Sequence, residues 1–293
     1  MNIAIIGSGG DGAGMNECLY VLSQNLKKHK VTLFNYGYQG IIEDNVANYT
    51  LSTLRKERKN GGIIIKSSRS NEFMTDQGFA KAINTLKRHN IDVLIVMGGN
   101  GSWMGAKALS KAGINVMFIP TTIDNDIATS DYSIGFYTAI ANAVDFVKKV
   151  DTSMKAFDRT CIYEVMGRHC QDLAQNVARQ TDASFCFVSS SSQEKMYEEL
   201  KEIYKTNLAP IIILQENTTP ADDLKKYLQS KFPEKDIKVA IVGYVQRGGI
   251  ACREELEMAK GFALKTVECI ENKLFNKIIT FNQSVNNFEE EEI

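Results

Sequence analysis

The alternation of short apolar segments with segments of helical periodicity is the feature of this sequence that most constrains its fold. Residues 92–97 predict a strand that is apolar at every position after Asp92, which is typical of a strand buried on both faces of a parallel sheet. Residues 77–89, just before this run, place apolar side chains at helical spacing. Strands that alternate with helices through short connections predict right-handed crossovers and an α/β fold with mostly parallel sheets.

The same alternation recurs along the chain and indicates two lobes, for which 293 residues are sufficient. We expect one lobe from residues 1–135 with 250–275, a second from 136–249, and a tail from 276–293 whose acidic end, 289–292, is typical of a solvated segment. Further strands are expected at 2–6, 31–34, 113–119, 160–165, 184–188, 209–214 and 238–242, further helices at 15–26, 103–111, 133–150, 171–180, 193–204, 221–232 and 253–274, and a polar loop at 44–62.

Glycine, aspartate and arginine clusters follow the ends of these predicted strands. Two glycine-rich loops, 7–14 and 98–102, each lead from a strand into a helix. Backbone N–H groups in such loops, together with a helix N-terminus, can bind phosphate. Ligands of open α/β sheets bind at the carboxyl ends of the strands, so we expect these loops to converge on one cleft.

The segment Pro120–Asp126 follows a buried strand and places Asp124 and Asp126 two positions apart. One carboxylate can accept a proton from a substrate hydroxyl, while the other positions a metal ion or the first carboxylate. The alternative is an ordinary acidic turn, because Asp and Asn are common turn residues. The glycine and arginine clusters at the other strand ends favour a functional site over an ordinary turn.

Composition limits the classes of partner. A net charge of −1 argues against bulk electrostatic binding of nucleic acid or an anionic membrane, so any phosphate must be held by a few placed cations. Four arginines near the expected loops can serve: Arg69, Arg159, Arg168 and Arg247. The six cysteines show no paired metal spacing and fit reduced thiols of a cytoplasmic protein, although His169 between Cys161 and Cys170 makes a metal site conceivable. We expect no signal peptide and no membrane segment.

Five motifs, in order and at similar spacing over nearly the whole chain, resemble the 6-phosphofructokinase family. They are Ser8-Gly9-Gly10-Asp11 with Gly14-Met15-Asn16, Gly98-Gly99-Asn100-Gly101-Ser102, Thr122-Ile123-Asp124-Asn125-Asp126, Met166-Gly167-Arg168 and Gln246-Arg247-Gly248-Gly249. The resemblance implies two Rossmann-like lobes with mostly parallel sheets, the first binding nucleotide and the second sugar phosphate.

The resemblance also implies a role for each matching residue. Asp124 would take the proton from the sugar 1-hydroxyl, and the other catalytic positions would be Thr122, Asp126, Arg168 and Arg69. The nucleotide would contact Gly9, Gly10, Asp11, Arg69, Ser70, Gly99, Asn100, Gly101 and Ser102, with Mg²⁺ at Asn100 and Asp126. The sugar phosphate would contact Thr122, Asp124, Arg159, Met166, Gly167, Arg168, Glu216, Lys238, Tyr244 and Arg247. Arg159 would reach the site of a neighbouring subunit in a homo-oligomer, most simply a tetramer.

Three departures from the family pattern concern the phosphoryl donor and the metal. Asn100 stands where the family usually has a metal-associated Asp. Gly101 matches the ATP-using form, because pyrophosphate users typically carry a second Asp there. Thr121 matches neither the Gly of ATP users nor the Lys of pyrophosphate users.

Other departures concern the sugar phosphate and an effector. Lys238 and Tyr244 replace an Arg and a His that bind the sugar phosphate. Tyr20 and Val150 lie near the places of effector-binding arginines in bacterial members, so we expect that effector site to be lost. The chain is also expected to lack the last helix of the family.

The implied activity is the ATP-dependent, Mg²⁺-assisted phosphorylation of fructose 6-phosphate, a glycolytic reaction of the cytoplasm. Two alternatives remain at this point. One is a catalytically weak paralogue with a regulatory or binding role. The other is a kinase that uses another donor, such as pyrophosphate, or another sugar phosphate.

Overall fold

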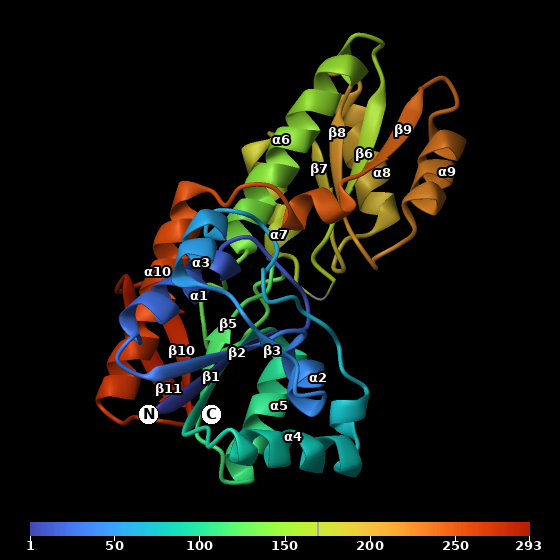
Figure 1. Cartoon of the computed structure of the whole chain (residues 1–293). Helices are drawn as coiled ribbons and strands as arrows, with labels where there is room; N and C mark the ends of the chain where they lie inside the picture. The colour runs from blue at the N-terminus through green and yellow to red at the C-terminus, as the bar shows by residue number, and fades with distance from the viewer. Residues whose placement is uncertain (169) are drawn as a thin grey trace. The chain divides into compact units, whose positions relative to one another are not determined.

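The computed structural model describes residues 1–168 and 170–293. The chain forms two compact units, residues 1–137 with 247–293 and residues 138–246 (Figure 1). The long helix α6 (Phe136–Lys155) begins in the first unit and continues into the second. The assignment of nucleotide to one unit and sugar phosphate to the other stays a prediction.

The first unit is built on a seven-stranded sheet in the order β11-β10-β5-β4-β1-β2-β3. The five strands from β10 to β2 are parallel, and the antiparallel strands β11 and β3 form the edges. The predicted α/β fold is therefore confirmed. Its elements are β1 (Asn2–Ser8), α1 (Met15–Asn25), β2 (Lys30–Phe34), α2 (Gly37–Ile42), β3 (Val46–Ala47), α3 (Leu51–Glu57), η1 (Glu72–Met74), α4 (Asp76–Arg88), β4 (Val93–Gly98), α5 (Asn100–Lys111), β5 (Val116–Pro120), α10 (Arg253–Glu271), β10 (Lys277–Asn282) and β11 (Asn287–Glu292).

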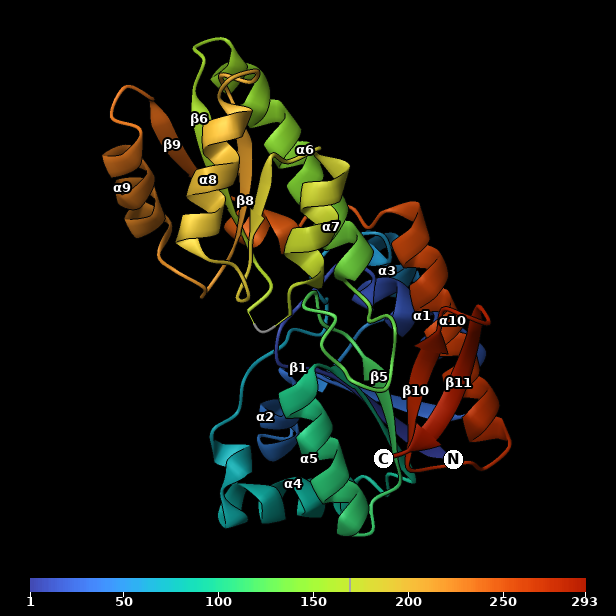
Figure 2. The ribbon, with the colours of Figure 1, turned by 180° about the vertical axis from the view of Figure 1, so that it is seen from behind.

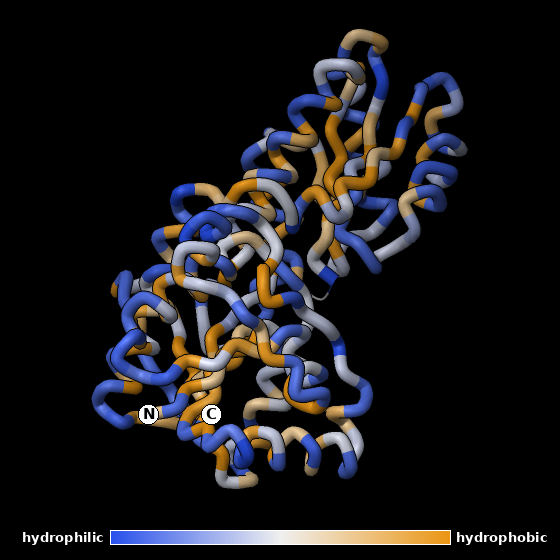
Figure 3. Tube along the Cα trace, in the orientation of Figure 1, coloured by the Kyte–Doolittle hydropathy of each residue, from blue (hydrophilic) through white to orange (hydrophobic). Residues whose placement is uncertain are grey.

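Helices cover both faces of this sheet, with α2, α4 and α5 on one face and α1 and α10 on the other (Figures 1 and 2). Side chains alternate along β1, so Ala4 and Ile6 enter the core beneath α4 and α5 together with Phe34 and Phe118. The central strands β4 and β5 consist mostly of hydrophobic residues, whereas the helices carry many hydrophilic ones (Figure 3). This two-sided burial explains the continuous apolar run in β4.

The prediction of a tail at residues 276–293 was wrong, because these residues form β10 and the edge strand β11. Phe288 of β11 lies between the rings of Phe262 and Phe281, with centroid distances of 5.0 Å to each. Two carboxylates of the acidic run are paired: Lys265 of α10 lies 2.7 Å from Glu290, and Lys277 of β10 binds Glu292. The hydrogen bond to Glu290 raises the pKa of Lys265.

The polar segment 44–62 was expected to be a loop, and it contains β3 and the helix α3. The hydroxyl of Thr50 caps α3 by accepting a hydrogen bond from the N–H of Thr53, and Leu54 buries its apolar side. One buried leucine is too weak a periodic signal to indicate a helix from sequence. The helix predicted from residue 133 begins three residues later, because Ser133 and Ile134 bond to the preceding loop and the N–H of Gly135 donates to α10.

The second unit contains a four-stranded parallel sheet in the order β7-β8-β6-β9. Helices α8 and α9 pack on one face, around Leu200 and Leu224, and α6 and α7 lie on the other (Figures 1 and 2). Strand β9 is an edge. The elements are β6 (Thr160–Val165), α7 (Asp172–Gln180), β7 (Phe185–Phe187), α8 (Gln193–Ile203), β8 (Ile211–Gln215), α9 (Ala221–Lys231), β9 (Ile237–Ile241) and the 3₁₀ turn η2 (Gly243–Arg247).

Candidate active site

The two glycine-rich loops meet at the carboxyl ends of the adjacent strands β1 and β4. The hydroxyl of Ser102 donates a hydrogen bond to the carbonyl of Ser8 at 3.0 Å. A side chain at Gly98 would collide with Ser102, because a Cβ there would lie 2.5 Å from the serine Cβ. Gly9 has a φ of 87° and its N–H donates to the carbonyl of Ser68. Glycine is thus required where the loops approach one another and where the first loop turns.

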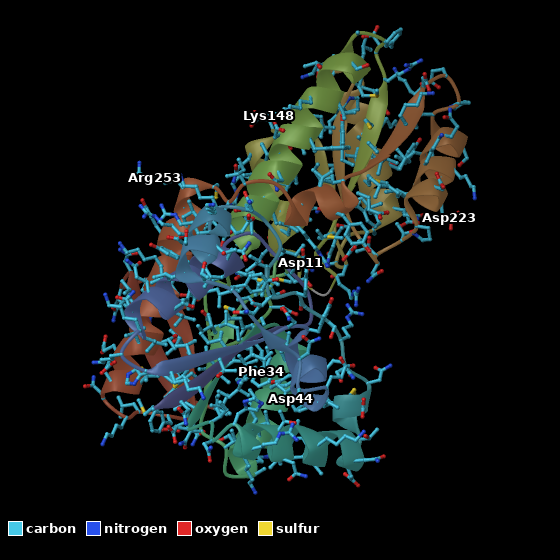
Figure 4. The ribbon with its side chains drawn as sticks, in the orientation of Figure 1. Asp11, Phe34, Asp44, Lys148, Asp223 and Arg253 are labelled. Carbon is cyan, nitrogen blue, oxygen red and sulfur yellow. The ribbon has the colours of Figure 1, made fainter. Side chains whose placement is uncertain are left out.

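A cavity of about 530 Å³ lies beside the first glycine loop. Its lining includes Asp11, Asn16, Lys66 and Ser67. The buried amide of Asn16 shapes one wall, since it donates to the carbonyl of Asn60 and accepts from the N–H of Ile64. Asp11, in the middle of the first loop, lies at this cavity (labelled in Figure 4).

The second glycine loop forms the N-terminus of α5, next to the acidic segment. The side-chain N–H of Asn100 donates to the backbone carbonyl of Asp126 at 3.1 Å. A Cβ at Gly99 would lie 3.5 Å from the Cβ of Thr122, so the loop runs alongside that side chain. A Cβ at Gly101 would meet no atom within 4 Å. The positive end of the α5 dipole therefore adjoins the acidic segment, with open space beside Gly101.

The acidic segment is a folded loop and is held by defined hydrogen bonds. The hydroxyl of Thr122 accepts from the N–H of Asp124 at 3.1 Å, and Asn125 adopts a left-handed conformation with φ 52°. The hydroxyl of Ser133 donates to the carbonyl of Thr122 at 2.7 Å and lies 3.1 Å from the amide oxygen of Asn125. Asp124 and Asp126 are both half-buried. The bonding explains why an Asn separates the two carboxylates, since it tolerates positive φ.

Arg247 is brought to the first glycine loop by the close approach of two backbones. The N–H of Gly61 donates to the carbonyl of Gly249 at 2.6 Å, and a Cβ at Gly61 would lie only 2.9 Å from the carbonyl carbon of Gly248. A guanidinium nitrogen of Arg247 then lies 3.8 Å from the carboxylate of Asp11. The guanidinium of Arg247 thus lies beside the glycine loop that is predicted to bind nucleotide.

Arg69 and Ser70 follow the segment that lines the cavity at Lys66 and Ser67, and their contacts differ. Arg69 is exposed. The hydroxyl of Ser70 donates to Gln39 at 2.6 Å and accepts from the N–H of Phe73 at 3.0 Å, so it also caps the turn η1. Its predicted contact with nucleotide stays a prediction, as does that of Arg69.

In the second unit, one set of predicted sugar-binding residues lies at the carboxyl ends of β6 and β8. The N–H of Met166 donates to the side chain of Gln246 at 2.8 Å, and the carbonyl of Gly167 accepts from Gln215 at 2.6 Å. The N–H of Glu216 donates to the carbonyl of Val165, which brings Glu216 beside this loop. Arg168 follows directly and is exposed.

Gln215 and Gln246 support this loop and were not assigned any role from sequence. They are 2% and 0% exposed, respectively. A buried side-chain amide at a strand end is the signal that would have found them, but burial is not visible in the sequence.

The structure separates Arg159 and Lys238 from this first set. Arg159 precedes β6 and Lys238 is the second residue of β9, so both lie at the amino ends of strands. The carboxylate of Asp236 lies 2.6 Å from Arg159 and 2.7 Å from Lys238. Hydrogen bonds from Lys238 and Arg159 lower the pKa of Asp236. The length of β6 places the two sets about 20 Å apart, while Tyr244 is highly exposed in η2.

The remaining positions of interest are those considered for a metal ion and for an effector. No three His, Cys, Asp or Glu side chains are grouped as a metal site within residues 1–168 and 170–293. The metal site considered around His169 lies outside the described residues. Tyr20 is buried beneath Arg58, whose guanidinium is 5.6 Å from the ring centroid, and Val150 lies in α6. None of the described helices is long and apolar enough to cross a membrane.

The fold defines the class of protein. The structure superposes on that of Pichia pastoris phosphofructokinase with a TM-score of 0.89 at 24% identity, covering 99% of this chain and 34% of that one. A pyrophosphate-dependent phosphofructokinase from Marinobacter aquaeolei gives a TM-score of 0.86 at 18% identity, with 99% and 81% covered. The chain therefore has the fold of a phosphofructokinase.

Sequence comparison identifies the family itself. The phosphofructokinase family model matches residues 2–270. The chain is 37% identical to an ATP-dependent 6-phosphofructokinase of Clostridioides difficile over 273 residues, which are 92% of this chain and 85% of the relative. It is 32% identical to the enzyme of the same name from Oceanobacillus iheyensis, with 97% and 90% covered. The chain belongs to the phosphofructokinase family, as the five motifs predicted.

Proposed function

We propose that this chain is an ATP-dependent 6-phosphofructokinase, which transfers the γ-phosphoryl group of ATP to the 1-hydroxyl of fructose 6-phosphate. One observation carries the proposal: the N-terminus of α5, where we place the donor phosphates, is bonded to the acidic loop through Asn100 and Asp126. A donor phosphate at that N-terminus would thus lie beside the candidate base. Such a reaction belongs to glycolysis, and we infer a cytoplasmic location.

In the proposed reaction Asp124 accepts the proton of the 1-hydroxyl as that oxygen bonds to the γ-phosphorus, and the bond to ADP breaks. The N–H groups at the start of α5 and the guanidinium of Arg247 oppose the negative charge on the phosphates. Mg²⁺, when bound, would neutralise charge on the transferring group. The side chain of Asn100 bonds to the backbone of Asp126, so the two residues are neighbours. Mg²⁺ would be held by the amide oxygen of Asn100, the carboxylate of Asp126 and the donor phosphates, since Mg²⁺ needs few protein ligands.

ATP is the proposed donor, in preference to pyrophosphate. Gly101 leaves open space beside the α5 N-terminus, where an acidic side chain would obstruct a nucleotide. Thr121 is 4% exposed, and its hydroxyl has no hydrogen-bond partner in the described part of the chain. Because threonine is uncharged, this position offers no cation to a pyrophosphate. A coupled assay should give a higher kcat/KM with ATP than with pyrophosphate, and the reverse ratio would contradict the proposed donor.

The alternative of a catalytically weak paralogue is not favoured, because the acidic loop and both glycine loops are intact and bonded to one another. The same assay tests this alternative. We expect turnover of fructose 6-phosphate with ATP and Mg²⁺, and binding of both substrates without turnover would support the paralogue.

We further infer an oligomer with shared sites. Arg159 and Lys238 lie at the opposite end of β6 from Met166 and Glu216, so one chain cannot place all four around one sugar phosphate. A second copy of the chain can supply the missing cations. Mixing inactive Arg159→Ala with inactive D124N under conditions of subunit exchange should restore activity. A fully active monomer by sedimentation would contradict the shared site.

A further inference from the structure

A buried carboxylate at the start of α10 is not used by the proposed reaction. Glu255 is the third residue of α10 and is 0% exposed, whereas Arg253, two residues earlier, points into solvent (Figure 4). One oxygen of Glu255 accepts hydrogen bonds from the N–H of Gly135 at 2.7 Å and from the hydroxyl of Tyr132 at 2.5 Å. A carboxylate is costly to bury, so its retention at this place needs a reason.

The local structure favours an ionised Glu255. It lies in the first turn of α10, where the helix dipole stabilises negative charge. Two donors converge on the same oxygen. Burial, together with the neighbouring charge of Glu255, raises the pKa of Tyr132 well above its usual value, so the phenol remains a donor.

Both donors belong to residues 130–135, which we name the brace. The brace is bonded to the acidic loop on its other side: Ser133 donates to the carbonyl of Thr122, and the N–H of Ile134 donates to the carbonyl of Pro120 at 3.0 Å. The brace is also anchored to β10, because the hydroxyl of Ser130 accepts from the N–H of Phe281 at 2.9 Å. Movement of the brace therefore moves the loop that carries Asp124.

The brace also approaches the first glycine loop. A Cβ at Gly12 would lie 3.3 Å from the Cα of Gly135. A Cβ at Gly14 would lie 2.8 Å from Ile134 and 2.9 Å from the side chain of Glu255. Glu255 is thus packed between the glycine loop and the brace, where it can set the spacing between the predicted donor site and the candidate base.

We propose that Glu255 is a positioning residue, which holds the brace through Tyr132 and Gly135 and thereby fixes Asp124 relative to the donor phosphate. The proposal rests on the proposed kinase function. The brace reaches the acidic loop through the backbone carbonyls of Thr122 and Pro120, so we expect its loss to alter the position of the loop more than the binding of substrate. A displacement of about 1 Å in such a loop can lower a rate about 10²-fold.

The test compares wild type with Glu255→Ala, Glu255→Gln and Tyr132→Phe, measuring kcat, both KM values and amide hydrogen exchange over residues 121–135. In Glu255→Ala we expect kcat to fall about 10²-fold with little change in either KM, and exchange of the segment to accelerate. The amide oxygen of Glu255→Gln can still accept both hydrogen bonds, so this variant should recover most of kcat. Tyr132→Phe keeps the bond to Gly135 and should lose less than Glu255→Ala.

The matched control is Thr266→Val on the same helix. Thr266 is also 0% exposed, but its hydroxyl donates only within α10, to the carbonyl of Phe262. We expect wild-type kcat and wild-type exchange at 121–135 in this control. An equal loss of kcat in Thr266→Val and Glu255→Ala would overturn the proposal, as would unchanged exchange in Glu255→Ala.

Two further outcomes are informative. If Glu255→Ala does not fold, then wild-type kcat and exchange in Tyr132→Phe would overturn the proposal, and faster exchange with reduced kcat would support it. If wild type shows no turnover with any donor, the kinase function fails. Hydrogen exchange in the variants would still decide whether Glu255 holds the acidic loop.

Discussion

Gly261 in α10 offers a sharp test of how the C-terminal strands dock. Alanine in the interior of a helix normally stabilises it relative to glycine by about 0.5–1 kcal/mol. A Cβ at Gly261, however, would lie 2.1 Å and 2.2 Å from two ring carbons of Phe288 on β11. That ring is held between Phe262 and Phe281, so it cannot move aside without losing both aromatic contacts.

The steric effect should exceed the helix-propensity effect. Overpacking costs about 1–3 kcal/mol, and each lost aromatic pair costs about 0.5–1.5 kcal/mol. We expect Gly261→Ala to destabilise the first unit by about 1–2 kcal/mol after the propensity gain is subtracted. The melting temperature should fall by about 2–4 °C for each kcal/mol.

Thermal unfolding of four proteins tests this reasoning: wild type, Gly261→Ala, Phe288→Ala and the double variant. In the Phe288→Ala background the added methyl group meets no ring, so Gly261→Ala should raise the melting temperature. The change in melting temperature caused by Gly261→Ala thus has opposite signs in the two backgrounds, as expected for two residues in contact. A rise in both backgrounds would show that β11 does not dock on α10 as described.

Three further predictions concern the site. D124N should lower kcat by about 10²–10⁴-fold, because an amide accepts no proton; steady-state kinetics measure this, and a nearly unchanged kcat would exclude Asp124 as the base. Asn100→Asp should lower the Mg²⁺ concentration needed for half-maximal rate, since a carboxylate offsets the charge of the ion; an unchanged Mg²⁺ titration would mean that the metal is held without this position. Asp236→Ala should lower the KM for sugar phosphate at low salt, because it frees Arg159 and Lys238; a higher KM would show that Asp236 orients the two cations.

Much of the fold was accessible from local patterns. The apolar run in β4 and the helical spacing in α4 are properties of consecutive residues, and both elements were predicted. The glycine loops and the acidic loop were also found, because each has a distinctive composition at a strand end. Periodicity and turn chemistry depend on a few neighbouring residues, so the sequence expresses them directly.

The predictions failed where the residues nearest in sequence suggested an environment that differs from the one in the fold. An acidic run suggested a solvated tail, but in β11 alternate side chains face opposite sides of the sheet. Phe288 and Glu290, two residues apart, therefore share the face that meets α10. There Phe288 packs against Phe262, and Glu290 pairs with Lys265. The lysine that offsets the charge is 25 positions away in sequence (290 − 265), and no local pattern links the two.

The sequence by itself determined the α/β class, the family motifs and the residue types offered for phosphate and proton transfer. Only the tertiary structure decided which of these meet: Asn100 bonds to Asp126, Arg159 lies far from Met166, and Glu255 holds the brace. The reason is physical. Helical and extended periodicity stabilise elements over short stretches of chain, whereas burial of a carboxylate with its donors occurs only when α10 packs against the brace, more than a hundred residues away in the sequence.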